Sequence, residues 1–285
     1  DNYLRRHNGK IVLGAYGMDY YWAYVNAHQK PLRYSDFNIG DTQRNDPTAM
    51  KDYNDWVSTA KERLNKYIAA DCDAIVAALY EYKVTYDHTE FKDKTTFIPL
   101  PIKIAHPSEV PAAKTGVTAD RQDKLRVFVG ISRARSSYKG TDIMLRAAQR
   151  IAEKWSDRVE LLVAEGLPFE EYKRMYARAD IILDQLYAYT PAMNALEAMN
   201  RGVIVVGGGE EEQYGIIDEH DLRPIINVQP TEESVYEELE KLILRADINR
   251  LKHDSQEYVR RHHDHIKVAR EYETVYHRLC KVKKV

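Results

Sequence analysis

The sequence predicts an α/β protein in which helices alternate with parallel strands in a doubly wound arrangement. Short apolar runs rich in β-branched residues, such as Val203–Val206, recur along the chain, as expected of buried parallel strands. Segments with helical apolar spacing separate these runs, and such alternation is typical of a parallel sheet with helices on both faces. The length of 285 residues is sufficient for two domains of ordinary size.

The first hundred residues predict a small domain with few strands. Its strands are expected at Lys10–Ala15, Asp73–Leu79 and Thr96–Ile98. One helix is expected from Asp46-Pro47 to about Ala70, because proline suits the first helical position and the apolar residues that follow keep helical spacing. The segment Pro99–His106 (PLPIKIAH) indicates an extended crossing, since each proline disfavours helix in the residue before it. We therefore place a first domain at residues 1–100.

The remainder alternates more regularly and predicts a second domain over residues 101–265, followed by a helix within residues 266–285. Strands are expected at Leu125–Gly130, Val159–Ala164, Ile181–Leu183, Val203–Val206 and near Ile225-Ile226. Helices are expected at Gly140–Trp155, Phe169–Ala177, Glu232–Leu244, Ile248–Arg261 and Ile266–Lys281. The segment between Val159 and Asp180 has room for one strand and one helix.

The stretch from Asp180 to Gly209 predicts a strand–helix–strand unit. Thr190 suits a helix N-cap, Pro191 the first helical position, and Gly202 the residue just past the helix end. Open α/β sheets bind ligands at the carboxyl ends of their strands. A helix N-terminus at that edge offers unpaired N–H groups to an anion such as phosphate.

A basic loop, Gly130–Gly140 (GISRARSSYKG), joins a predicted strand to a predicted helix. Arg133, Arg135 and Lys139 bring two guanidinium groups and an ammonium group to the same edge of the sheet. Arginine offers a planar fork for phosphate oxygens and lysine a compact charge, which together suit a diphosphate. The alternative is a solvated basic loop without a ligand.

Two other groups of residues are open to more than one interpretation. Glu197 lies among small and apolar residues of the predicted helix, so it either holds ligand hydroxyls or is an ordinary exposed helical glutamate. The run Arg261–His265 (RHHDH) resembles a metal site in composition, but no further ligands accompany it at zinc spacing. The sequence contains no P-loop, no GxGxxG and no Ser/His/Asp signature, which disfavours a nicotinamide-dependent oxidoreductase.

Composition excludes several broad classes. The formal net charge of −2 gives no general attraction to nucleic acid or to anionic membranes. No apolar run approaches the roughly 18 residues that span a bilayer, and residues 1–10 lack the apolar core of a secretory signal. Cys72 and Cys280 are the two cysteines, so no disulfide framework is expected and a cytoplasmic location is favoured.

Taken together, these motifs resemble the retaining GT-B glycosyltransferases of the group 1 (family 4) set, especially bacterial capsule and surface-polysaccharide members. In that family a strand ends in Gly, an Arg follows, and Lys-Gly opens a helix, as Gly130, Arg133 or Arg135, and Lys139-Gly140 do here. The family's Leu-Glu-Ala-Met helix matches Leu196–Met199. The resemblance covers roughly residues 97 to 285.

The resemblance implies a GT-B-like fold of two Rossmann-like domains with parallel sheets. It further implies that the first domain is incomplete at its N-terminus, and that the helix in residues 266–285, with Tyr272 and Tyr276, packs back on that domain. The implied activity is retaining transfer of a sugar from a nucleotide-diphosphate sugar to a glycan or lipid-linked acceptor in cell-surface polysaccharide synthesis. No metal or other cofactor is implied. Peripheral membrane contact is left open, with the basic tail Lys281–Lys284 as its local hint.

Residue roles also follow from the resemblance. Arg133, Arg135 and Lys139 would hold the donor diphosphate, and Asp19 would act at the acceptor side, because Tyr16–Asp19 resembles the family's His-Gly-x-Asp segment. The residues expected at the donor are Glu197, Tyr189, Thr190, Ala192, Met193, Asn194, Gly130, Glu165 and Pro168. Among them, Glu197 would bind the donor ribose. Tyr189 stands where the family has the first Glu of its paired motif, eight positions before Glu197. This departure leaves a binding or scaffold protein without turnover as the alternative.

Overall fold

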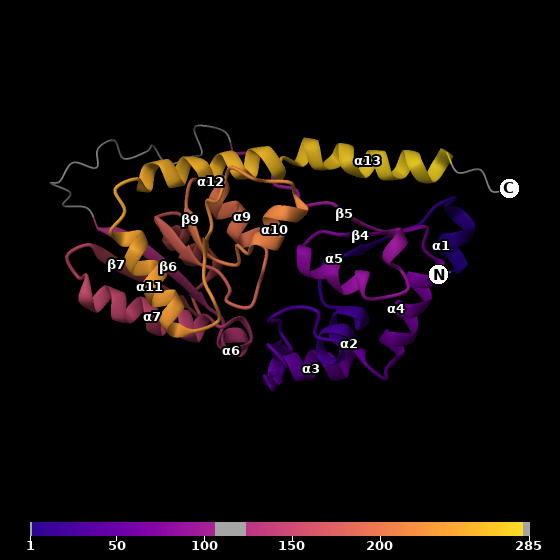
Figure 1. Cartoon of the computed structure of the whole chain (residues 1–285), viewed down its shortest axis with the longest axis horizontal. Coiled ribbons are helices and arrows are strands. Elements are labelled where there is room, and N and C mark those ends of the chain that lie inside the picture. The colour runs from indigo at the N-terminus through magenta and orange to yellow at the C-terminus, as the bar shows by residue number, and fades with distance from the viewer. Residues whose placement is uncertain (1, 106–123, 282–285) are drawn as a thin grey trace. The chain divides into compact units, whose positions relative to one another are not determined.

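In the computed structural model, which describes residues 2–105 and 124–281, the chain divides into two compact units (Figure 1). Unit 1 combines the residues up to Pro101 with those from His262 onward, and unit 2 is Ile102–Arg261. His106 of the predicted crossing and most of the basic tail lie outside the described residues. Within the part of the chain that is described, no helix is long and apolar enough to cross a membrane.

Unit 1 is built on a three-stranded parallel sheet. Its strands are β1 (Val12–Ala15), β4 (Ala74–Ala77) and β5 (Thr95–Phe97), in the order β1-β4-β5. The three strands predicted from the sequence are confirmed, with slightly different ends. Successive residues of a strand point to opposite faces of the sheet, so each face has its own helices.

One face of this sheet packs on aromatic residues of α2 (Tyr20–His28) and α5 (Tyr80–Asp87). Tyr21 and Tyr86 share a buried cluster with Ile75 and Ala77. On the other face, α13 (His265–Lys281) lies along the strands, and its Val268 and Val275 pack on Ala74, Val76 and Ile98 (Figure 1). Unit 1 also contains α1 (Asn2–His7), the hairpin β2 (Asn38–Ile39) and β3 (Thr42–Gln43), and the 3-10 helix η1 (Lys92–Lys94).

The prediction of a single helix between Asp46 and Ala70 is wrong. The structure contains two helices there, α3 (Pro47–Trp56) and α4 (Ala60–Asp71). Asp46 caps the first as expected. The break follows from Ser58, which has a φ of +62°, and from Thr59, whose hydroxyl accepts from Lys61 N and so starts a new helix.

Unit 2 is built on a five-stranded parallel sheet in the order β10-β9-β8-β6-β7. The strands are β6 (Leu125–Ile131), β7 (Val159–Glu165), β8 (Ile181–Leu183), β9 (Ile204–Gly207) and β10 (Ile226–Asn227). All five predicted strands are confirmed. The chain moves outward from β6 to β7 and then returns to β8 on the other side of β6. The strand order therefore reverses at β6 and β8, where open sheets form a crevice for ligands.

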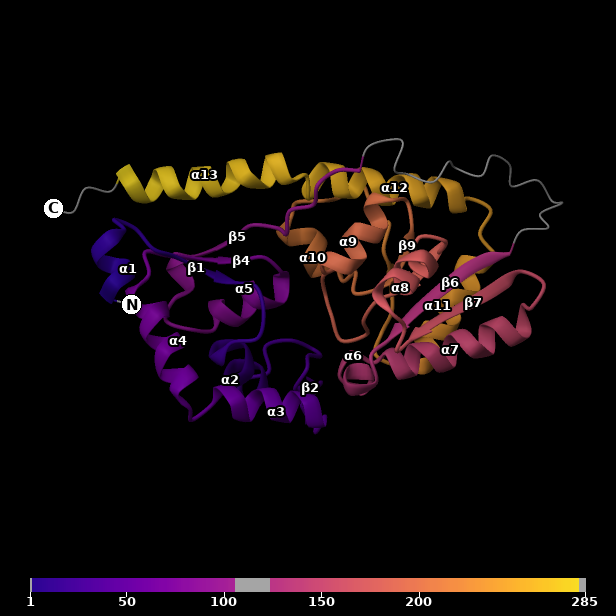
Figure 2. The ribbon, with the colours of Figure 1, turned by 180° about the vertical axis from the view of Figure 1, so that it is seen from behind.

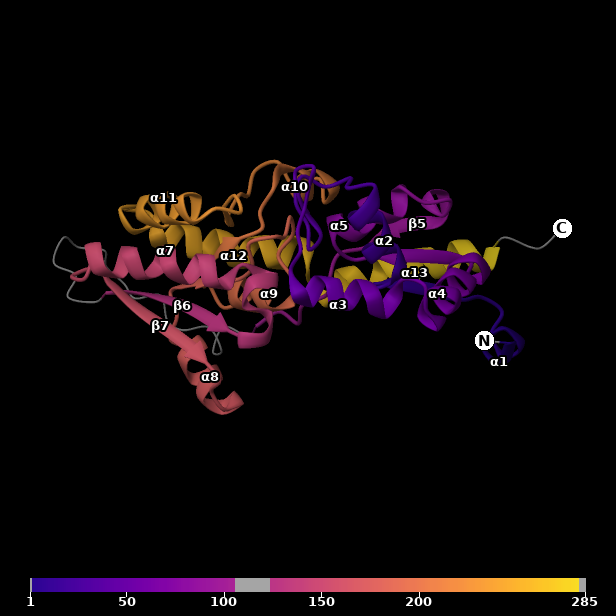
Figure 3. The same cartoon turned by 90° about the horizontal axis from the view of Figure 1, so that it is seen from below.

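Helices cover both faces of this sheet. On one face, α7 (Thr141–Lys154), α11 (Glu232–Ile243) and the first turns of α12 (Ile248–His262) bury residues such as Met144 and Leu239 against Val127 and Val129. On the other face, α8 (Phe169–Tyr176) packs Tyr172 and Tyr176 on Phe128. Figures 2 and 3 show α8 opposite α11 across β6 and β7. Among the described residues of unit 2, the remaining helices are η3 (Arg133–Arg135), α6 (Ser136–Lys139), α9 (Met193–Asn200) and α10 (Glu211–Ile216).

The helix predicted to start at Thr190 and Pro191 begins later than expected. Its N-cap is Ala192, with no side-chain capping bond, and α9 starts at Met193. Thr190 is buried, and the carbonyl of Tyr189 accepts a hydrogen bond from Glu210 N, so this segment is tied to the chain beyond β9 rather than to the helix. The expected end is confirmed, because Gly202 has a φ of +74° just past the helix.

Candidate functional site

The loop after β6 places one lysine at the carboxyl edge of the unit 2 sheet. The predicted basic loop folds into η3 and α6, and the chain then turns sharply at Gly140, which has a φ of +72°, into α7. A Cβ atom at Gly140 would lie 2.6 Å from Leu186 Cβ, so glycine also allows close packing at this turn. The turn fixes the position of Lys139, the last residue of α6.

The loop after β8 brings a carboxylate to the same edge. Asp184 directly follows β8, and its backbone N–H donates to Val206 O (3.1 Å). Its side chain accepts from Asn194 Nδ2, in the first turn of α9, at 3.3 Å. Burial raises the pKa of Asp184 above its ordinary value, while the charge of Lys139 and the hydrogen bond from Asn194 oppose the rise.

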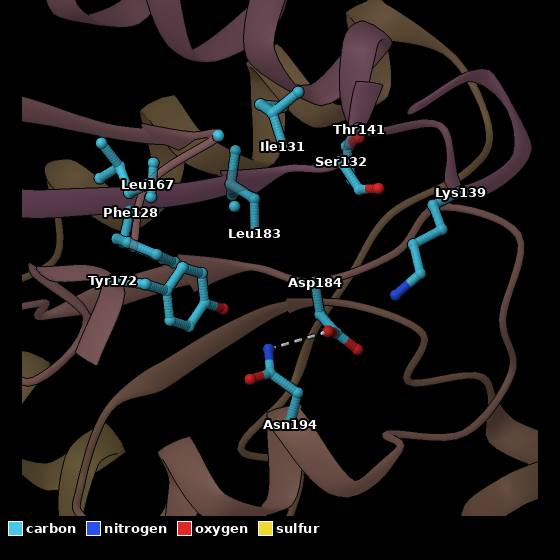
Figure 4. A pocket seen from close by; sticks show the side chains of 13 residues that line it. Phe128, Ile131, Ser132, Lys139, Thr141, Leu167, Tyr172, Leu183, Asp184 and Asn194 are labelled. Carbon is cyan, nitrogen blue, oxygen red and sulfur yellow. Dashed lines mark hydrogen bonds between the residues drawn. The ribbon is translucent and has the colours of Figure 1, made fainter. Parts of the chain in front are cut away.

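These residues line a cavity of about 280 Å³ at the carboxyl ends of β6, β7 and β8. Figure 4 shows its arrangement: Phe128, Leu167 and Tyr172 lie at one end, Lys139 at the other, and Asp184 and Asn194 between them. The remaining lining residues are Gly130, Ile131, Ser132, Thr141, Ala164, Gly166 and Leu183. The cavity thus has an aromatic and apolar end, a middle with a carboxylate and an amide, and a cationic end.

At the cationic end, the charge of Lys139 acts on the Asp184 carboxylate, but the described residues form no ion pair with the lysine. Within residues 2–105 and 124–281, no carboxylate oxygen lies within ion-pair distance of the Lys139 ammonium group. A cation in such a position can hold an anionic ligand, and a phosphate group supplies the oxygens that lysine prefers. Ser132 adds a hydroxyl group to this region of the cavity.

Of the residues predicted at the donor, the structure brings Gly130, Lys139 and Asn194 together in this cavity. Arg133 and Arg135 do not line it. The side chain of Arg133 is 85% exposed, and its guanidinium group pairs with Glu165 (2.8 Å). The guanidinium group of Arg135 lies over the ring of Tyr138. Both arginines therefore lie beside the cavity, on the loop that carries Lys139.

The other predicted donor residues do not line this cavity. Tyr189 and Thr190 are buried, whereas Met193 is exposed at the start of α9. Ala192 is half-buried, and its carbonyl group accepts a hydrogen bond from Leu196 N. Glu165, at the end of β7, forms an ion pair with Arg133, and Pro168 directly precedes α8.

Glu197 lines a different depression. This space of about 340 Å³ is formed by Lys103, Ile104, Ala105, Glu197, Asn200 and Arg201. Asn200 ties the segment entering unit 2 to α9, because its side chain accepts from Ala105 N (3.1 Å) and donates to Lys103 O (2.9 Å). The cavity that holds Lys139 and the depression that holds Glu197 have no lining residue in common.

Asp19, predicted at the acceptor side, lies in unit 1. Its carboxylate caps α2 by accepting from Trp22 N (2.8 Å) and also accepts from the Tyr86 hydroxyl (2.6 Å). Burial raises its pKa, and these two hydrogen bonds oppose the rise. Asp19 lines a mostly apolar pocket of about 350 Å³ at the carboxyl end of β1, together with Tyr16, Trp56 and Lys61.

Sequence reasoning missed Asp184 and Tyr172. Asp184 carries a weak signal, since an acidic residue directly after a buried strand of a parallel sheet lies at the ligand-binding edge. Tyr172 carries none, because a tyrosine within a short helix is most simply a core residue. No group of three or more His, Cys, Asp or Glu side chains in the described parts of the chain is placed to hold a metal ion.

Comparison with solved structures finds glycosyltransferases. Sucrose-phosphate synthase from Thermosynechococcus elongatus is 13% identical, with a TM-score of 0.58, over 99% of this chain and 71% of that one. A mutant of S. aureus TarM, solved with fondaparinux, alpha-GlcNAc-glycerol and UDP, is 10% identical over 76% of this chain, with a TM-score of 0.56. The match spans 46% of the TarM chain. Anabaena HepE with UDP-glucose is 15% identical, with a TM-score of 0.53, over 77% of this chain and 68% of that one.

The sequence itself matches no protein-family model and no curated protein. At identities of 10 to 15%, the structural neighbours establish the fold alone. These neighbours are GT-B glycosyltransferases. The α/β fold predicted from the sequence is confirmed: the chain has the GT-B-like fold, with two Rossmann-like units on parallel sheets.

Proposed function

We propose that the protein is a glycosyltransferase that moves a sugar from a nucleotide-diphosphate sugar to a glycan or lipid-linked acceptor in cell-surface polysaccharide synthesis. The observation that carries this proposal is the cavity of unit 2, which offers an aromatic end for a nucleobase and Lys139 for the diphosphate (Figure 4). It lies where the strand order of the sheet reverses, at the site that nucleotides occupy in other open α/β sheets. The GT-B-like fold, and the UDP or UDP-glucose bound to neighbours such as TarM and HepE, agree with it.

The proposed chemistry depends on fixed positive charge. When the sugar leaves its donor, negative charge develops on the nucleoside diphosphate, and a cation already in place stabilises that charge without reorganising. Lys139 is the residue proposed for this role. Arg133 and Arg135 lie on the same loop and are proposed as further phosphate ligands, together with the N–H groups of Ala192–Asn194 at the start of α9. We propose retention of anomeric configuration, by departure and attack on one face of the sugar, without a metal ion or other cofactor.

The acceptor is proposed to bind unit 1, where Asp19 lines the pocket at the end of β1. A mostly apolar wall suits the hydrocarbon or ring faces of a lipid-linked or glycan acceptor. We propose a cytoplasmic location, with peripheral contact to the membrane where the acceptor is lipid-linked.

The test is binding followed by a product assay on the 285-residue chain. UDP-, ADP- and GDP-sugars are titrated by calorimetry, and the one that binds is then incubated with glycan and lipid-linked acceptors. Lys139→Ala should weaken nucleotide binding at least tenfold, because a charge-assisted contact to phosphate contributes about 1.5–3 kcal/mol. Lys154→Ala, at the far end of α7, removes an exposed lysine paired with Glu240 and should leave binding unchanged. Absence of binding to all three nucleotide classes would overturn the proposal.

One observation favours a second candidate, a nucleotide-sugar-binding protein without turnover. Tyr189 occupies the position of a glutamate that the family resemblance places at the transferred sugar, and its side chain is 1% exposed and does not line the cavity. Tight binding with neither transfer nor hydrolysis would support this second function. Turnover that depends on Lys139 would support the first.

A further inference from the structure

The carboxylate of Asp184 has fewer hydrogen-bond partners than those of four other buried or half-buried aspartates, Asp19, Asp46, Asp73 and Asp180. Asp180 accepts from Arg126 N and pairs with Lys252, and Asp73 accepts from Arg5, Lys10 and Ile11 N. Asp19 and Asp46 cap helices. In the described structure, the side chain of Asp184 accepts one hydrogen bond, at 3.3 Å from Asn194, caps no helix, and interacts with Lys139 only through its charge. Most of its accepting capacity therefore faces the cavity.

The position of Asp184 within the cavity restricts what it can meet. Figure 4 shows it between the aromatic end, at Phe128 and Tyr172, and the cationic end, at Lys139. In a nucleoside diphosphate the ribose likewise lies between the base and the phosphates. A ligand with its base at Tyr172 and its phosphates at Lys139 would bring its ribose to Asp184 and Asn194.

The chemistry of a carboxylate agrees with this position. An ionised carboxylate only accepts hydrogen bonds, so it favours ligand groups that donate and disfavours phosphate oxygens. The 2′- and 3′-hydroxyl groups of ribose are two adjacent donors. Carboxylates bind ribose hydroxyls in other doubly wound sheets, though from a different strand. Glu197, the carboxylate expected at the ribose from the family resemblance, lines a separate depression.

We propose that Asp184, with Asn194 holding its carboxylate, accepts hydrogen bonds from the ribose hydroxyls of the bound nucleotide and so selects ribonucleotide over deoxyribonucleotide donors. This inference rests on the proposed nucleotide site in unit 2. It assigns the role of ribose ligand to the end of β8 instead of to α9.

The test compares ribose and deoxyribose forms of the same nucleotide on the full chain. UDP, ADP and GDP are titrated first, and the tightest is then compared with its 2′-deoxy and 3′-deoxy forms. Wild-type protein should bind the ribose form at least about tenfold more tightly than either deoxy form. This is the range expected for a hydrogen bond to a charged group. Asp184→Ala should bind the three forms almost equally, and Asp184→Asn should reduce the preference. Asp157→Asn, which removes the same charge from an exposed position, should keep it.

The outcomes separate this inference from the proposed function. If no nucleoside diphosphate binds, both fail. If binding occurs and weakens in Lys139→Ala, but the deoxy preference is the same in wild type and Asp184→Ala, the role of Asp184 is overturned and the nucleotide site stands. If Asp184→Ala weakens the binding of UDP-glucose but not that of UDP, the hydroxyl groups that donate to Asp184 belong to the transferred sugar, and the ribose assignment is overturned. Melting temperatures of all variants near that of wild type ensure that altered binding does not reflect unfolding.

Discussion

The backbone N–H of Leu186 donates a 2.9 Å hydrogen bond to the carbonyl of Lys139. This bond joins the loop after β8 to the turn before α7, so the segments that carry Asp184 and Lys139 position one another. Gly140 makes the approach feasible, since its φ of +72° turns the chain and its missing side chain leaves room for Leu186. The charge distribution of the cavity therefore depends on a glycine that does not itself line the cavity.

Gly140→Ala is expected to destabilise unit 2 and to weaken nucleotide binding. The new Cβ would lie 2.6 Å from Leu186 Cβ and would hold a left-handed conformation, which together cost about 1–3 kcal/mol. Urea unfolding measures the loss, and calorimetry with UDP, ADP and GDP measures binding. The matched control is Gly215→Ala in α10, which has nothing within 4 Å of its Cβ position and should be neutral or slightly stabilising. Equal stability of the two variants would contradict the role of Gly140.

The ion pair with Glu165 is expected to hold Arg133 away from the phosphates of the bound nucleotide. Glu165→Gln releases the Arg133 guanidinium group and should raise nucleotide affinity roughly two- to fivefold, the range of an exposed ion pair. The same change in an Arg133→Ala background should have no effect. The gain in affinity of Glu165→Gln over wild type should shrink at high salt, because exposed charges are screened. If Glu165→Gln acts equally in both backgrounds, Arg133 does not contact the nucleotide.

The strands and most helices of unit 2 were predictable because local signals agreed with the tertiary structure. Val203–Val206 and the other apolar runs are strands since they are buried on both faces of the sheet. The helix α2 was not predicted, because six of its nine residues are buried and its apolar residues form no single stripe. Thr190-Pro191 carried a helix-start signal that failed because the neighbouring backbone is bonded to Glu210 instead.

The candidate site was predictable where it depends on topology. Gly130 and Lys139 belong to the connection after β6, and Asn194 belongs to the start of α9 after β8. They meet because the carboxyl ends of parallel strands share one edge. The sequence could not distinguish Lys139 from Arg133 and Arg135, because which cation faces the cavity depends on the turn at Gly140. Nor could it separate Glu197 from Asp184, since their placement depends on where α9 begins and how it packs.

The buried hydrogen bond between Asp19 and Tyr86 is expected to stabilise unit 1. Tyr86→Phe removes the donor to a desolvated carboxylate and should lower the free energy of unfolding by about 1–3 kcal/mol. Asp19→Ala should cost more, because it also removes the cap of α2, which contributes about 0.5–2 kcal/mol. Tyr67→Phe, on the exposed side of α4, is the control and should be neutral. A neutral Tyr86→Phe would show that this hydrogen bond does not hold Asp19.

His263 makes the stability of unit 1 sensitive to acid. The ring is 3% exposed, and Nδ1–H donates to Leu100 O (2.9 Å). Burial lowers its pKa to about 4, with a smaller contribution from the charge of His262, while the Leu100 carbonyl opposes the shift. The folded state therefore holds a neutral imidazole that the unfolded chain would protonate near pH 6.5.

The free energy of unfolding should consequently fall as the pH decreases from about 6.5 to about 4. Above pH 6.5 the histidine is neutral in both the folded and the unfolded state, and the protein keeps its full stability. As the pH falls from 6.5 toward 4, only the unfolded state takes up the proton, which lowers the free energy of unfolding by up to about 3 kcal/mol. His263→Gln, which can still donate to Leu100 O, should be less sensitive across this range, as measured by urea unfolding at pH 7.5, 6, 5 and 4. His277→Gln, on the exposed side of α13, should keep the wild-type slope. Parallel pH profiles for His263→Gln and wild type would show that folding does not lower the pKa of His263.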